Sequence, residues 1–179
     1  MSATQVEETP VRWLDVGEMA TWLDLVHLVV TLPQALDRQL RAEAGISHVY
    51  YSILATLSDR ADRRSPMAEL ARVTGLSLSR LSHAIDTLCD KGWVQRFPTA
   101  DPRRQLAGLT EDGAALLERI APGHLAEVRR LVFDRLEPEQ VAQLAEIASR
   151  LLQGISDVHT TRRSARSPRS RSDAATSFR

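Results

Sequence analysis

Two short amphipathic segments joined by a tight turn constrain the fold of this chain more than any other feature. The first opens at Ser65-Pro66, a cap followed by proline at the first helical position. Thr74–Leu76 interrupts the pattern, and Ser77 can cap a second helix that continues to about Asp90. The inward positions of this second helix follow helical spacing: Leu81, Ala84, Ile85 and Leu88. The arrangement is typical of a helix-turn-helix.

A β-hairpin is predicted directly after the second helix. Gly92 stops the helix, and Trp93–Phe97 indicates a strand because it is rich in aromatic and β-branched residues. Residues 98–105 form a polar turn region, and Leu106–Leu109 can return as the second strand. The sequence therefore predicts a mainly α-helical fold: a helix-turn-helix with a small two-stranded β wing, flanked by long helices.

The start of the second helix carries small hydrogen-bonding and cationic groups on its outward face. A helix fits the major groove of B-DNA, and its N-terminal residues reach the base edges. We predict DNA contacts from the residues of this surface: Ser77, Ser79, Arg80, Ser82 and His83. The alternative is an ordinary solvated helix face, and this helix alone does not decide between the two.

Cations at the predicted wing favour the DNA interpretation. Arg103 and Arg104 follow Asp101-Pro102 at the tip of the turn, and Arg96 lies on the preceding strand. A narrow minor groove attracts inserted arginine, so these three arginines are predicted DNA-binding residues. The charge pattern agrees, because residues 60–104 carry a net charge of +4 in a chain whose overall net charge is zero.

The composition excludes several other classes of protein. The 179 residues are 43% apolar and 26% charged, as in ordinary soluble globular proteins. Cys89 is the only cysteine, which excludes a disulfide framework within the chain, and the five histidines show no metal-ligand spacing. The sequence shows no phosphate-binding glycine loop, nucleophile elbow or paired-carboxylate cleft. We therefore predict neither an enzyme nor a cofactor or metal site.

Targeting features indicate a cytoplasmic location. The N-terminus is acidic, whereas a secretory signal begins with basic and then apolar residues. The most apolar stretch, Trp22–Leu36, contains Asp24, His27 and Pro33 and is short for a membrane span. With one cysteine and no such signals, we expect a reducing compartment and no membrane partner.

Long helices are predicted on both sides of the helix-turn-helix. Apolar residues recur at helical spacing from Trp13 onward, and Pro33 should kink or split that helix. Thr110 caps a helix that Pro122 and Gly123 should bend or break, and Pro138 opens the last helix. The predicted regions are a loose N-terminus (1–12), an N-terminal helix region (13–45), a winged lobe (46–112), C-terminal helices (113–158) and a disordered Arg/Ser-rich tail (159–179).

Residues 66–113 resemble the winged-helix core of the MarR (multiple antibiotic resistance) family of bacterial transcriptional regulators. The matching pieces are, in order, Glu69-Leu70-Ala71, Leu78-Ser79-Arg80-Leu81-Ser82, Gly92-Trp93-Val94-Gln95-Arg96, Asp101-Pro102-Arg103-Arg104 and Leu109-Thr110-Glu111-Asp112-Gly113. With its flanking helices the resemblance covers roughly residues 14–157. It implies a homodimer whose arms are regions 13–45 and 113–158, a pseudo-palindromic operator in double-stranded DNA, and a repressor.

The resemblance also implies a site for a small aromatic or phenolic ligand. The candidate lining residues are Trp22, Val26, His27, His48 and Tyr51. For each of them, packing in the core or in an interface is the alternative. No redox response is expected at Cys89, because the helix C-terminus and Asp90 raise the pKa of its thiol and no second cysteine is present.

Two other functions stay open from the sequence. A winged helix can act as a protein–protein adaptor without DNA binding, although such a protein has no need of Arg103 and Arg104. The Arg/Ser-rich tail suggests RNA, but single-strand RNA modules expose aromatic residues on a sheet, and only Trp93 and Phe97 are available here. A dimeric, sequence-specific DNA-binding regulator is the favoured interpretation.

Overall fold

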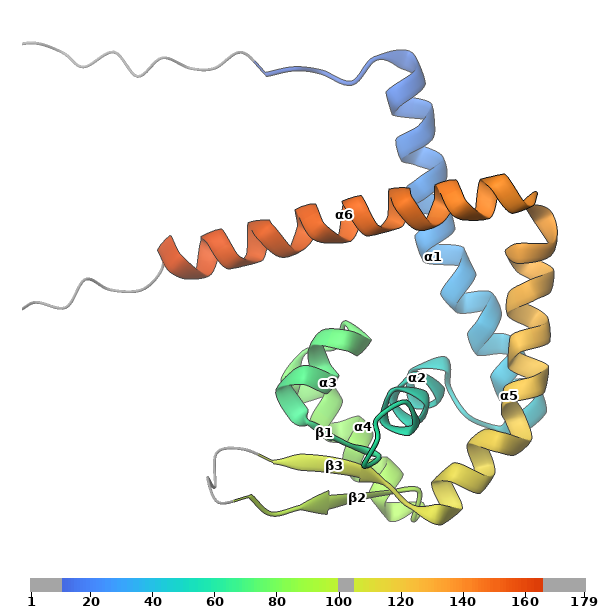
Figure 1. Ribbon diagram of the computed structural model, residues 1–179, viewed down its shortest axis with the longest axis vertical. Helices are drawn as coiled ribbons and strands as arrows, with labels where there is room; N and C mark the ends of the chain where they lie inside the picture. Colours follow the sequence, from blue (N-terminus) through green and yellow to red (C-terminus); the bar gives the residue numbers. More distant parts are fainter. Residues whose placement is uncertain (1–10, 100–104, 166–179) are drawn as a thin grey trace, which may run out of the picture. The chain divides into compact units, whose positions relative to one another are not determined.

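The computed structural model describes residues 11–99 and 105–165, and the chain divides into two units after Leu131 (Figure 1). The elements of the first unit are α1 (Val16–Ala44), α2 (His48–Ser58), β1 (Arg64–Pro66), α3 (Met67–Thr74), α4 (Leu78–Asp90), β2 (Val94–Phe97), β3 (Leu106–Leu109) and α5 (Glu111–Leu131). The second unit contains a short 3-10 turn (Phe133–Arg135) and α6 (Pro138–Ala165). The mainly α-helical, winged helix-turn-helix prediction is confirmed.

Local sequence signals set the ends of the helices around the turn. The hydroxyl of Ser47 accepts a hydrogen bond from the Tyr50 amide, and that of Ser77 accepts one from the Arg80 amide. Both serines therefore satisfy a backbone donor that has no partner inside the helix. Gly75 ends α3 with φ 68°, a left-handed conformation that glycine adopts without strain. The predicted caps of α2 and α4 are confirmed.

The wing has three strands, not two. β3 lies in the middle and pairs antiparallel with β2 (Val94 opposite Leu109) and with β1 (Arg64 opposite Gly108). The prediction that Ser65 caps α3 is wrong, because Ser65 is buried within β1 and α3 begins without a side-chain cap. The sequence did not predict β1 because three residues are too few to show the alternation of apolar and polar residues that marks a strand. Its proline is tolerated because β1 lies at the edge of the sheet.

The core of the first unit joins the winged lobe to the C-terminal half of α1. Aliphatic side chains from α1, α2, α3, α4 and β2 are fully or almost fully buried there: Leu40, Ile53, Leu54, Leu57, Leu70, Leu81, Ile85, Leu88 and Val94. The four inward positions predicted for α4 are all buried. Burial on one face fixes the opposite face of α4 toward solvent.

The internal prolines do not end their helices. The sequence predicted that Pro33 would kink or split its helix; α1 runs through Pro33, so the split is wrong. α5 runs through Pro122 and changes direction along its length (Figure 1). A proline removes one backbone hydrogen bond and crowds one carbonyl. The many remaining bonds of helices with 29 and 21 residues maintain the helix on both sides.

α1 (Val16–Ala44) lies within the predicted N-terminal helix region 13–45, whereas α6 continues to Ala165, into the stretch predicted to be disordered from residue 159. Backbone bonding within a helix needs no apolar packing, and arginine and alanine are good helix formers. Residues 1–10, 100–104 and 166–179 lie outside the described part of the chain, and with them the rest of the predicted tail.

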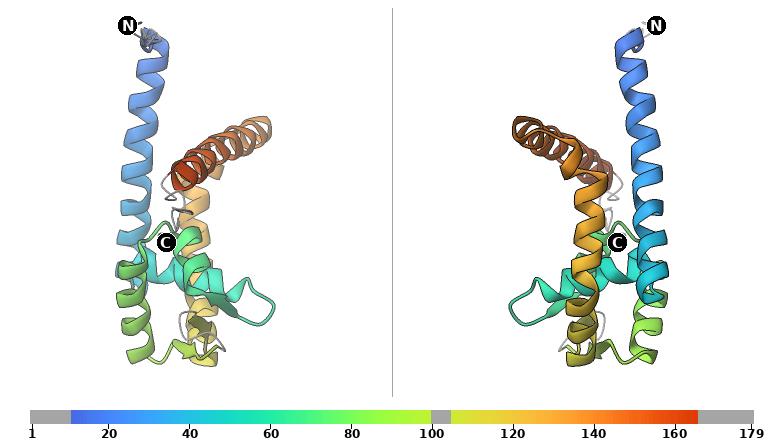
Figure 2. Two further views of the ribbon diagram at one scale, coloured as in Figure 1. Left: turned by 90° about the vertical axis from the view of Figure 1, so that its left-hand side faces the viewer. Right: turned by 90° about the vertical axis from the view of Figure 1, so that its right-hand side faces the viewer.

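α1 is the one helix in residues 11–99 and 105–165 with the length and composition of a membrane span. An 18-residue window of it has a mean hydropathy of 1.3, and only 6% of that window is buried. Figure 2 shows its N-terminal half standing clear of α2 and α4. The continuous helix is thus longer than the interrupted stretch that the sequence indicated.

Candidate nucleic-acid interface

The outward face of α4 has the polar character that the sequence predicts. Ser77, Ser79, Arg80 and His83 are exposed at the N-terminal end of this helix, whereas Ser82 is half-buried. The buried side chains on the opposite face hold α4 against the lobe, so the exposed groups sit on a rigid support. Four of the five predicted α4 contacts are therefore available to a partner.

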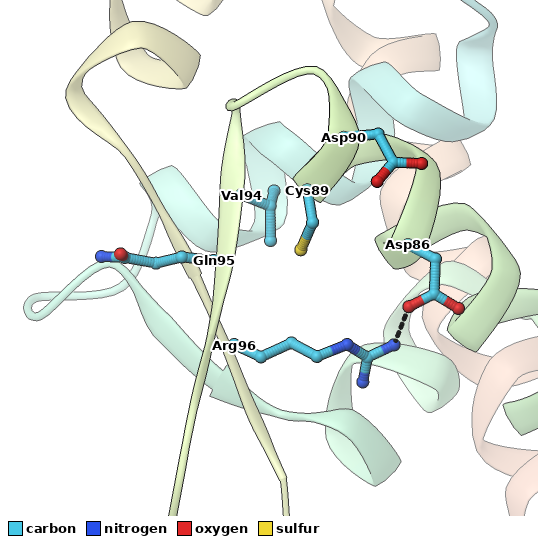
Figure 3. Close-up of a pocket in the computed structure, with 6 residues that line it drawn as sticks. All are labelled: Asp86, Cys89, Asp90, Val94, Gln95 and Arg96. Carbon is cyan, nitrogen blue, oxygen red and sulfur yellow. Dashed lines mark hydrogen bonds and ion pairs between the residues drawn. The ribbon is translucent and has the colours of Figure 1, made fainter.

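Arg96 is the predicted wing cation whose surroundings the structure describes. Its guanidinium turns toward α4, where Nη2 lies 2.7 Å from Oδ1 of Asp86 (Figure 3). The same nitrogen lies 3.2 Å from Oγ of Ser82. Nη1 lies 2.5 Å from Oε1 of Gln105. The arginine is thus held by the protein itself. Arg103 and Arg104, the other two predicted wing contacts, lie outside the described residues.

Asp86 and Gln105 are the partners that sequence reasoning missed. One signal was present: β2 alternates, so Arg96 shares a face with the buried Val94, two residues earlier. That spacing turns Arg96 toward the lobe. Asp86 on α4 is ten residues from Arg96, and Gln105, just before β3, is nine residues from it; nothing in the sequence pairs either of them with Arg96.

Several other cations of the basic middle segment are paired. Arg60 bonds Glu69 at 2.6 Å, and the guanidinium of Arg64 lies 3.7 Å from the centre of the Phe97 ring. Lys91 lies 5.1 Å from the ring of Trp93. The net charge of +4 for residues 60–104 therefore overstates the positive charge that is available to a partner.

Of the five predicted ligand-lining residues, the structure brings two together. His48 and Tyr51 of α2 both contact His124 of α5, with ring centres 5.7 Å and 4.1 Å from it. Trp22, Val26 and His27 are exposed on α1. The His48 amide bonds Asp37, fifteen residues beyond Trp22, which is about 22 Å along a helix. One copy of the chain therefore does not gather all five.

The ring cluster sits where α1, α2 and α5 meet. His124 is 5% exposed, and its Nδ1 lies 3.3 Å from Oε1 of Gln39 in α1. Burial lowers the pKa of His48, with an opposing effect of Asp37. Burial also lowers the pKa of His124; the nearby His48 lowers it further, and Glu43 opposes this. At a given pH, burial therefore favours the neutral form of both imidazoles more than in a solvent-exposed histidine.

We predict that acid destabilises this junction through His124. The unfolded chain takes up protons near pH 6.5, before the folded chain does, so folding free energy is retained above that pH and falls as the pH drops below it. His124→Gln should flatten this loss in urea unfolding measured at pH 7.5 and 5.5. His83→Gln, at an exposed histidine, is the matched control and should keep the wild-type pH dependence; equal profiles for all three proteins would contradict the assignment.

Cys89 lies on the pocket between α4 and β2 (Figure 3). Burial raises the pKa of its thiol; Arg96 opposes this, while Asp86 and Asp90 add to it. The raised pKa leaves little thiolate, which is the reactive form. The physical basis for expecting no redox response is thus burial first, with the neighbouring carboxylates adding to it.

A polar recognition helix on a buried support, beside a β wing, defines a winged-helix protein of the DNA-binding class. Residues 44–105 match the model of the MarR family. The multiple antibiotic resistance protein MarR of Salmonella typhimurium is 32% identical over 134 residues, which cover 73% of this chain and 92% of the relative. The chain belongs to the MarR family of transcriptional regulators.

Other relatives agree with this assignment. The HTH-type transcriptional repressor YetL of Bacillus subtilis is 27% identical over 142 residues, or 77% of this chain and 84% of the relative. Sco3205 of Streptomyces coelicolor, a MarR family transcriptional regulator solved in complex with DNA, has a TM-score of 0.77 and 42% identity. That similarity covers 82% of this chain and 92% of Sco3205. These relatives are regulators, which confirms the prediction that the chain is not an enzyme.

Proposed function

We propose that this protein is a homodimeric, sequence-specific repressor that binds a pseudo-palindromic operator in the cytoplasm. The observation that carries the proposal is the exposed polar face of α4, fixed by its buried face beside a three-stranded wing. Ser77, Ser79, Arg80 and His83 would read the major groove, and Arg103 would enter the minor groove. Two DNA complexes support it: Sco3205 with DNA, and a MarR variant from E. coli with operator DNA, at 27% identity and TM-score 0.62.

Exposed apolar side chains support dimerisation. α1 and α6 each leave a row of large apolar groups in contact with solvent: Trp22, Leu23, Leu28, Val29 and Val30 in α1, and Leu144, Ile147, Leu151, Leu152 and Ile155 in α6. Soluble monomers rarely expose contiguous apolar surface of this kind. A second copy of the chain would cover it, and the two recognition helices would then face successive turns of DNA.

Anisotropy of labelled duplexes tests the proposal. Duplexes tiled upstream of the gene, titrated at several salt concentrations, should include one that binds far more tightly than the others. Arg103→Ala and His83→Ala should weaken that binding, while Glu146→Gln, on the exposed surface of α6, should not. Equal weak binding to every tile would contradict operator recognition and favour the adaptor alternative. Sedimentation of the same protein should give the mass of a dimer.

Release by a small aromatic or phenolic acid is the remaining part of the proposal. A surface groove beside His48 is lined by Pro33, Gln34, Asp37, Arg38 and Val49. Its apolar walls suit a ring, and Arg38 is a cation for a carboxylate. Salicylate, titrated into the protein–duplex complex, should release the DNA from wild type and less so from Arg38→Gln. DNA release that is equal in both proteins would place the ligand elsewhere.

A further inference from the structure

The guanidinium of Arg96 links strand β2 to the recognition helix and to the residue before β3. On α4, Nη2 reaches the carboxylate of Asp86 and both the hydroxyl and the carbonyl oxygen of Ser82, the last at 3.4 Å. Across the wing, Nη1 reaches Gln105. Figure 3 shows the side chain extending from β2 across the pocket to Asp86. One side chain thus joins three segments of the lobe.

This geometry suits arginine and no other residue. The guanidinium is planar and presents its donors in a fixed fork, so it can bond two elements at once. A lysine at the same position carries the same charge, but its single ammonium group cannot span both sets of acceptors. The side chain of Arg96 is 28% exposed, so part of its hydration is replaced by these protein acceptors.

The charge of Arg96 is already offset. Asp86 lies 2.7 Å from Nη2 and is itself 58% exposed on α4. A phosphate approaching Arg96 would meet this carboxylate as well, and it would have to displace bonds that are already made. Exposed Arg80, on the same helix, has no such acid within hydrogen-bond distance among the described residues.

We propose that Arg96 is a positioning residue for DNA binding: it fixes the wing against the recognition helix and does not itself contact phosphate. The inference rests on the proposed function, since it concerns how the same surface engages DNA. A wing whose strands are held against α4 keeps these elements in register with the DNA, so loosening them lowers affinity without removing a phosphate contact.

The salt dependence of binding, measured on the tiled duplex that binds most tightly, distinguishes a positioning role of Arg96 from a direct phosphate contact. Each phosphate contact that is lost lowers the slope of log Kd against log salt by about one. We expect Arg96→Gln and Arg96→Lys to weaken binding alike, by roughly tenfold, with the wild-type slope retained. Arg80→Gln is the control, because it removes an exposed cation that the proposed function places against the DNA, and its slope should fall. A normal affinity for Arg96→Lys, together with a reduced slope for Arg96→Gln, would overturn the inference.

A double-mutant cycle with Asp86→Asn gives an independent readout. If Arg96 acts through Asp86, Arg96→Gln should weaken binding less in the Asp86→Asn background than in wild type. If Arg96 contacts DNA, freeing it from Asp86 should make the same substitution at least as damaging. The sign of this difference decides between the roles, whatever Asp86→Asn does by itself.

Hydrogen exchange of the free protein needs no DNA. Amides of β2 and β3 should exchange faster in Arg96→Lys than in wild type, while those of α1 stay unchanged. Unchanged exchange in the wing would overturn the positioning role even if no tile binds. Conversely, if Arg96→Lys exchanges faster but the wild-type protein selects no duplex, the positioning role of Arg96 stands and only the proposed function is contradicted.

Discussion

Gly113→Ala is expected to destabilise the winged lobe by roughly 3 kcal/mol, at the upper end for overpacked sites. A Cβ at this position would overlap the carbonyl oxygen of Trp93 and lie 2.8 Å from Cδ1 of Leu109. The Trp93 carbonyl is backbone and accepts a hydrogen bond from the Thr110 amide, so it cannot rotate away. The strain must therefore be relieved by moving α5 away from the end of the hairpin.

Gly154→Ala is the matched control for this prediction. Gly154 also lies inside a helix, α6, but nothing stands within 4 Å of an added Cβ. There the change should be neutral or stabilising by up to about 1 kcal/mol, because alanine loses less conformational entropy in a helix. Urea unfolding should show a loss of stability for Gly113→Ala and no loss for Gly154→Ala. Equal free energies of unfolding would show that the close approach at Gly113 relaxes without strain.

Leu40→Ala is expected to lower the free energy of unfolding by about 3 kcal/mol. Leu40 has no exposed surface and belongs to the core that joins α1 to the lobe. Its truncation removes buried methyl groups and leaves a cavity that tightly packed neighbours cannot fill. Denaturant unfolding should show this loss to be similar at low and high protein concentration.

Leu28→Ala, in the same helix, should act by a different route. Leu28 is 52% exposed in the single chain, so its truncation should leave the intrinsic stability of the lobe nearly unchanged. If α1 forms part of a dimer interface, the loss should appear only as weaker association, and therefore as an unfolding midpoint that depends on protein concentration. If Leu28→Ala lowers the free energy of unfolding as much as Leu40→Ala at every protein concentration, Leu28 belongs to the core of the single chain and not to a dimer interface.

Local chemistry made much of the lobe predictable. Ser47 and Ser77 cap helices because their hydroxyls bond amides three residues ahead, and Gly75 ends α3 because it adopts a positive φ. The apolar period of α4 identified its buried face, and with it the exposed residues Ser79, Arg80 and His83. These signals act within one helical turn, so they can be identified in the sequence alone.

The hydrogen-bond partners of Arg96 were not predictable in the same way. In the sequence it is a cation on a wing strand, and such a cation indicates a DNA contact. In the structure its guanidinium bonds Ser82, Asp86 and Gln105, which come from other segments. The cluster of His48, Tyr51 and His124 is likewise assembled from α2 and α5, far apart in the chain.

From the sequence alone one could predict the short helices of the lobe, the caps of α2 and α4, the face of α4 that meets solvent and the family to which the chain is similar. Three features became visible only in the folded chain: β1 adds a third strand, α1 and α5 continue through Pro33 and Pro122, and particular groups hold Arg96 and His124. The difference lies in how far apart along the chain the interacting residues are. Caps and periodicity depend on bonds between near neighbours, whereas strand pairing, burial and the pKa of a buried histidine depend on residues that only folding brings together.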